Sequence, residues 1–191
     1  MNKIITLLAG MLLVAGLSGC LSPAGDNLTD KKATVKAMSD DSLQEFYVKY
    51  PELKQKVSQA AGYAIFKDFG VDIFIPSTES GWGMVCNNAT GEKTYIKMFS
   101  FGVGLGMGIR DFRALFVFKD QDNISKFINS GWGLGVQANA ALRFGDVGDG
   151  IAGAAEVSPG VTLYKVTRNG IVLHATVQGT KIWGNEDMNA K

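Results

Sequence analysis

The feature that most constrains the fold is a change of pattern at Gly62. Beyond this residue the chain consists of short β-rich runs separated by Gly, Asn and Asp, which is typical of an antiparallel sheet. Before it, residues 29–61 carry apolar side chains at intervals of three and four residues, as amphipathic helices do. One later helix is predicted over residues 120–130. We therefore expect an α+β fold in which these helices pack on the sheet.

Glycine is abundant, with 24 residues, and four glycines alternate with apolar residues from Gly102 to Gly108. In a strand this alternation leaves one face as bare backbone and makes the other face apolar. A bare face suits a strongly bent strand in a curved, barrel-like sheet. It also admits an acyl chain, a helix or another sheet at close range. We favour the bend, and we keep the glycines as candidate lipid-contact residues: Gly102, Gly104, Gly106 and Gly108.

A turn signal lies between two β-rich runs near the end of the chain. Asn169-Gly170 supplies the positive φ angles of a tight turn and separates residues 161–167 from residues 171–177. The sequence therefore predicts a hairpin here. From the lengths of the β-rich runs, the whole sheet is expected to hold about eight to ten short strands.

The first twenty residues resemble a bacterial lipoprotein signal. Lys3 precedes an apolar run over residues 4–16, which is shorter than the roughly 20 residues of a transmembrane helix, and Leu17-Ser18-Gly19-Cys20 follows. We expect residues 1–19 to be a signal peptide and Cys20 to be acylated, with fatty chains such as palmitate. Residues 20–27 then form the lipidated end and a tether. A single domain is expected over residues 28–188.

Charge and cysteine content exclude several classes of function. With 19 Lys and Arg against 18 Asp and Glu, the chain lacks the basic excess that nucleic acid binding requires. Attraction to anionic lipid would have to come from a local cluster of cations. If Cys20 carries the anchor, Cys86 has no cysteine left to pair with.

No motif in the sequence supports catalysis or a bound cofactor. His174 is the sole histidine, and its alternation pattern places it on the solvent side of a strand. A Gly-x-Ser-x-Gly elbow is absent, and the Gly-x-Gly-x-x-Gly match at residues 148–153 is not followed by a helix. One histidine and one thiol are too few for a zinc site. We therefore expect no enzyme activity, no metal and no cofactor.

An ordered series of short phrases resembles the SYLF domain family, in its bacterial lipoprotein branch. The resemblance covers roughly residues 40 to 188. It is carried by residues 61–66, 90–98, 102–113, 115–118, 127, 131–132, 135–138 and 179–183. Lys67 departs from it, since a proline often follows the first of these phrases in the family.

The resemblance implies a non-catalytic module that binds phospholipid or a membrane surface. Eukaryotic relatives bind phosphoinositides, partly through a basic, amphipathic N-terminal helix. The matching region here holds Lys31, Lys32 and Lys36 near the apolar residues Leu28, Val35 and Met38. The alternative is an ordinary helix that packs on the sheet with its lysines in water, and the narrow apolar stripe slightly favours that alternative.

These inferences together predict a lipoprotein of the bacterial cell envelope. Leu21 stands where an Asp commonly retains lipoproteins in the inner membrane, so the periplasmic face of the outer membrane is favoured. The expected partners are membrane lipid, through acylated Cys20, and a phospholipid ligand. The alternative function is structural, in which the glycine-rich sheet face docks a protein partner during envelope assembly.

Overall fold

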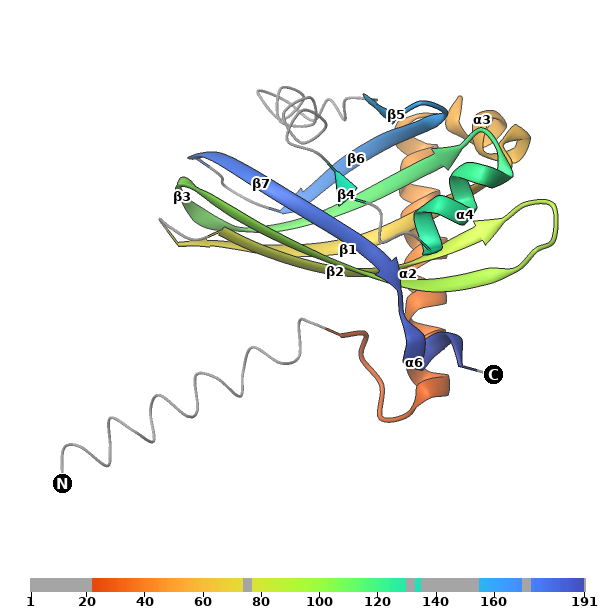
Figure 1. Ribbon diagram of the computed structural model, residues 1–191, viewed down its shortest axis with the longest axis horizontal. Helices are drawn as coiled ribbons and strands as arrows, with labels where there is room; N and C mark the ends of the chain where they lie inside the picture. The colour runs from red at the N-terminus through yellow and green to blue at the C-terminus, as the bar shows by residue number, and fades with distance from the viewer. Residues whose placement is uncertain (1–21, 74–76, 130–132, 135–154, 170–172, 191) are drawn as a thin grey trace.

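The computed structural model describes residues 22–73, 77–129, 133–134, 155–169 and 173–190 (Figure 1). Its helices are α2 (Leu28–Lys49), α3 (Leu53–Gln59), α4 (Gln121–Asn129) and α6 (Glu186–Asn189). Its strands are β1 (Gly62–Ile73), β2 (Ser77–Asn87), β3 (Lys93–Phe118), β4 (Gly133–Leu134), β5 (Ala155–Ser158), β6 (Val161–Asn169) and β7 (Leu173–Gly184). The expected α+β fold, with a curled antiparallel sheet, N-terminal helices and a later helix, is confirmed.

The sheet is organised by β3, a strand of 26 residues that pairs with four others. Its first half pairs with β2 and β7, and its second half pairs with β1 and β6. Because β1 and β2 are antiparallel to each other and to the halves of β3 beside them, those halves must run in opposite directions. In Figure 1, β3 accordingly doubles back.

The change of partner within β3 falls in the glycine-alternating segment. Gly102 is the last residue of β3 paired with β2, and Met107 is the first one paired with β1. Gly104 and Gly106 lie between these two positions and pair with β7. A strand that must reverse over so few residues is crowded at its bend, where glycine relieves the crowding.

The predicted hairpin between residues 161–167 and 171–177 is wrong. Across the described residues, β6 pairs with the second half of β3 and with β5, whereas β7 pairs with the first half of β3 and with β4. The reversal of β3 presents two separate edges, and the consecutive strands β6 and β7 each take one of them. The described residues form seven strands, of which the long β3 serves two parts of the sheet.

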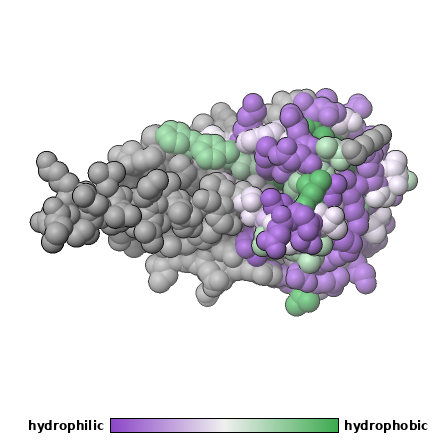
Figure 2. Space-filling view, turned by 90° about the horizontal axis from the view of Figure 1, so that it is seen from below, coloured by the Kyte–Doolittle hydropathy of each residue, from purple (hydrophilic) through white to green (hydrophobic). Residues whose placement is uncertain are grey.

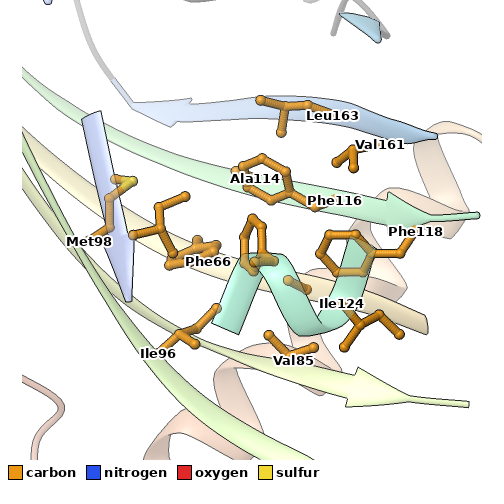
Figure 3. Close-up of a cluster of buried hydrophobic side chains, with 13 residues drawn as sticks. Phe66, Val85, Ile96, Met98, Ala114, Phe116, Phe118, Ile124, Val161 and Leu163 are labelled. Atoms are coloured by element: carbon orange, nitrogen blue, oxygen red, sulfur yellow. The ribbon is translucent and has the colours of Figure 1, made fainter. Parts of the chain in front are cut away.

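The inner, concave face of the sheet packs against α4. Ile124 and Phe127 of α4 are buried there, and the ring centroid of Phe127 lies 5.2 Å from that of Phe116 and 4.9 Å from that of Phe118. Figure 3 shows this cluster between the helix and the strands. An amphipathic helix that presents one apolar edge to a curled sheet is the arrangement predicted over residues 120–130.

The outer face of the sheet is covered by α2 and α3. Phe46 of α2 and Leu53 and Val57 of α3 pack on Ile65 of β1 and Leu115 of β3. All of these contacts lie at the end of the sheet where Figure 1 shows the helices, which we call the helical end. The opposite end, where β1 leads toward β2 and β3 doubles back, is called the far end.

Residues 22–27, just before α2, are packed rather than free. Pro23 is buried, and the Thr34 hydroxyl donates a 2.8 Å hydrogen bond to the Ala24 carbonyl oxygen. The side chain of Asn27 caps α2 by accepting a hydrogen bond from the Asp30 N–H. Gly25, at a φ of 145°, lets the backbone approach the first turn of α2 more closely than a side chain would permit. The described part of the predicted tether, residues 22–27, is therefore folded back along α2.

Candidate lipid-binding surface

The three lysines predicted to contact lipid lie in the first half of α2. Lys36 donates a 2.6 Å hydrogen bond to Asp40, and this bond together with the carboxylate charge raises the pKa of Lys36. The ammonium of Lys32 lies 5.7 Å from the centre of the Tyr95 ring. Lys31 is half-buried, and its backbone N–H bonds the Asn27 carbonyl oxygen. Of the three ammonium groups, that of Lys36 is thus held by an acid on its own helix.

The apolar residues beside these lysines are used mainly in packing. Val35 is fully buried in a cluster with Trp82, Met84 and Met188, and Met38 packs against the same cluster. Leu28 is exposed. A helix that has buried most of its apolar stripe on the sheet has little left to insert into a membrane. This geometry favours the alternative in which α2 is a packing helix.

The other predicted contact residues are placed only in part. The backbones of Gly102, Gly104, Gly106 and Gly108 lie in β3, at its bend and just beyond, and lipid contact there remains a prediction. Cys20 and the Gly-x-Gly-x-x-Gly segment at residues 148–153 lie outside the described residues.

A feature that the sequence analysis missed crosses the outer face beside α2. Lys67, Trp82, Lys97 and Trp183 are successive register partners across β1, β2, β3 and β7. The ammonium of Lys67 lies 5.9 Å from the Trp82 ring, and that of Lys97 lies 5.7 Å from the Trp183 ring. We call this row the Lys–Trp ladder. Trp82 is buried under α2, whereas Lys67, Lys97 and Trp183 are half-exposed.

Two phenylalanines follow the ladder toward the far end, on the same strand face as Lys97. Phe99 and Phe101 keep 45% and 52% of their surface exposed, which is unusual for large aromatic residues in a sheet. Phe99 is paired with exposed Lys181, and Phe101 is paired with Gly179. A side chain added at Gly179 would meet no atom within 4 Å, so the space beside Phe101 is open.

The surrounding surface makes this pair distinctive. Figure 2 shows hydrophilic residues gathered at the helical end and an apolar patch at the border of the described surface toward the far end. On the opposite face of the same stretch of β3, Ser100 is buried and shares a 2.6 Å hydrogen bond with Thr180. At this point of β3 the inner face is therefore buried and polar, whereas Phe99 and Phe101 are exposed on the outer face.

A signal for this surface was present in the sequence. Lys97, Phe99 and Phe101 alternate with Met98 and Ser100, which is the period of a strand with two unlike faces. The sequence did not show which of the two faces the helices would leave uncovered. Because large apolar residues are usually buried, the sequence pattern alone favours placing Phe99 and Phe101 in the core.

The described part of the chain lacks a cluster of metal-binding side chains. Over those ranges, no group of three or more His, Cys, Asp or Glu side chains could hold a metal ion. Cys86 is a half-buried free thiol opposite Tyr63. Burial, and then the neighbouring thiol, raise the pKa of the Tyr63 hydroxyl. Among the described helices, none is both long and apolar enough to cross a bilayer.

Comparison with known proteins gives one clear similarity. The chain is 25% identical, over 159 residues, to Beta cell expansion factor A of Aeromonas veronii. The aligned region covers 83% of this chain but only 59% of that protein, so the chain spans about six-tenths of its relative. No family model matches the sequence.

Proposed function

We propose that this protein is a non-catalytic, lipid-anchored protein of the bacterial envelope that binds membrane surfaces. The observation that carries the proposal is the outward pair Phe99 and Phe101 beside half-exposed Lys97 and exposed Lys181. Exposed apolar side chains next to cations are suited to a bilayer surface, because the apolar side chains can enter the acyl layer while the cations meet anionic headgroups. The resemblance to SYLF domains supports the same reading.

The charge distribution supports local rather than general attraction. The net charge of the chain is only +1, so binding to anionic lipid must come from cations gathered on one side. Lys97 and Lys181 flank the phenylalanines, and Lys32 lies on the same outer side over Tyr95. Acylation of Cys20 would hold this side near the bilayer, where weak contacts gain from a high effective concentration.

The test is flotation of the chain from Leu21 onward, which retains every described residue but cannot be acylated at Cys20. We expect it to float with vesicles rich in phosphatidylglycerol at about 50 mM salt, and less well at about 500 mM because surface charges are then screened. Vesicles of phosphatidylcholine alone should bind it more weakly. Absence of flotation at low salt would contradict membrane binding and favour docking of an envelope protein.

The anchor has a separate test. In bacteria producing the full chain, mass spectrometry of the N-terminal peptide should find Cys20 as the first residue, carrying fatty acyl groups. Cys20→Ser should leave the signal uncleaved. A mature protein with an unmodified Cys20 would contradict the anchor but leave the surface proposal standing.

A further inference from the structure

We propose that the sheet meets the membrane by the outer face of its far end, with Lys97 and Trp183 at the level of the lipid headgroups and Phe99 and Phe101 inserted beneath them. This inference rests on the proposed function and adds its geometry: the surface, the orientation and the depth. The partner is the interface of an anionic phospholipid bilayer.

The order of side chains along β3 is the first support. Every second residue of this stretch of β3 lies on the outer face, and these residues are Lys97, Phe99 and Phe101. A cation is thus followed along the strand by two exposed aromatic rings. Val103 and Leu105 are the next residues in the same alternation of the sequence. Phe99 lies about 7 Å beyond Lys97 along the strand, which is within the 5–10 Å that apolar faces enter an interface.

The Lys–Trp ladder is the second support. Indole and long-stemmed lysine side chains favour the boundary between hydrocarbon and water, because each has an apolar body and a polar end. Here Lys67, Lys97 and Trp183 are half-exposed and lie in one row across neighbouring strands. A row of such residues across a sheet marks a level, as the aromatic girdles of membrane-embedded sheets do.

The position of the N-terminal segment is the third support. Val35 of α2 packs on Trp82 of the ladder, and residues 22–27 fold back along the same part of α2. Figure 1 shows this segment below the sheet, at the foot of α2. Cys20 precedes Ser22 by two residues, a reach of at most about 7 Å. A lipid on Cys20 would therefore enter the bilayer on the side that carries the ladder.

The main experiment measures binding to phosphatidylglycerol vesicles by the chain from Leu21 onward. Phe99→Ser with Phe101→Ser should weaken binding about a hundredfold, at about tenfold for each ring withdrawn from the interface. The matched control is Val48→Ser, because Val48 is an apolar residue on α2 with 83% exposure, at the helical end. The control should bind within twofold of the unaltered protein.

A second variant guards against a folding artefact. Gly179→Asp adds a negative charge beside Phe101 in open space, so the fold should be kept while binding to anionic vesicles falls about tenfold. Lys97→Gln and Lys181→Gln should each reduce binding about fivefold, and only at low salt. Thermal unfolding of each variant should match that of the unaltered protein within a few degrees.

Depth is measured with a fluorescent label quenched by spin-labelled lipids. Each label is attached to a single cysteine in a Cys86→Ala background. A label at Phe99→Cys should be quenched by spins within the acyl region, and a label at Trp183→Cys should be quenched by spins near the headgroup. A label at Val48→Cys should be quenched by neither set of spins. Equal quenching at positions 48 and 99, or full binding by the double phenylalanine variant, would overturn this inference while leaving the proposed function intact. Failure of the unaltered protein to bind would instead remove the proposed function, and this inference with it.

Discussion

The two ends of the sheet use the same strands in opposite ways. At the helical end the rings of Phe66 and Phe116 point into the concave face and meet Phe127 of α4, while α2 and α3 cover the outer face. Toward the far end the inner face holds the hydrogen-bonded pair Ser100 and Thr180, and Phe99 and Phe101 are exposed outside. Among the described residues, the helical end therefore holds the packed core, whereas the outer face toward the far end keeps two phenylalanine rings exposed.

Removal of an aromatic ring should give the largest difference in stability loss between the two ends. Phe127→Ala removes a ring packed against Phe116 and Phe118 and should lower the free energy of unfolding by about 3–5 kcal/mol. Phe99→Ala removes a half-exposed ring and should cost about 1 kcal/mol or less. Urea denaturation of both variants measures the contrast, and equal losses would contradict the division.

Glycine substitutions should give the next largest contrast. A side chain at Gly83 would overlap the carbonyl oxygen of Ile65 on the neighbouring strand, so Gly83→Ala should destabilise by about 3 kcal/mol. Gly179→Ala fills open space and should change stability by no more than about 0.5 kcal/mol. Thermal unfolding compares the two, and a severe loss in Gly179→Ala would show that the space beside Phe101 is occupied.

The buried pair of hydroxyls lies where the inner face turns polar. Ser100→Ala leaves the Thr180 hydroxyl buried without this partner and should cost about 1–3 kcal/mol. Adding Thr180→Val should recover much of that loss, since no unpaired polar group then remains. A double-mutant cycle by urea denaturation tests this, and strict additivity of the two losses would contradict the coupling.

The smallest effect is a dependence on pH at the helical end. Burial raises the pKa of Tyr63 above the 10.0 of a free tyrosine, so the folded chain keeps this proton at pH values where the unfolded chain loses it. Stability should therefore fall as the pH rises above about 10. Tyr63→Phe should show a shallower decline in urea titrations between pH 9 and 11, and an unchanged slope would contradict the assignment.

Local patterns predicted most of the elements but not their partners. The helix expected over residues 120–130 is α4, at Gln121–Asn129. This prediction succeeded because the apolar period and the acidic first turn are local signals, contained within the helix itself. The Asn169-Gly170 signal failed because pairing was decided by distant β3, whose two halves bind β6 and β7 separately. Turn chemistry makes a hairpin favourable, but it cannot compete with a long strand that offers two edges.

The sequence predicted lipid contact by a basic helix, and that contact stays a prediction. Lys31, Lys32 and Lys36 were chosen from a basic helix, yet Lys36 is bound to Asp40 and Val35 is buried beneath the helix. Phe99 and Phe101 were passed over, because exposure depends on which face the helices cover. The covered face is decided only when the chain folds, since α2 then packs on Trp82 while, among the described residues, Phe99 and Phe101 stay exposed.

The doubled course of β3 has a consequence for biogenesis. Residues 96–107 of β3 acquire β7 as a partner, and β7 is the last of the described strands. During synthesis from the N- to the C-terminus, Ile96 and Met98 therefore lack their β7 partners, and that flank of the core stays open, until the chain has reached Ile182 and Gly184. A nascent polypeptide in this state exposes unpaired strand edges, which are prone to aggregation. A chaperone that binds unfolded chains would suit such a delay, and premature stop codons before β7 should yield aggregates rather than a smaller folded protein.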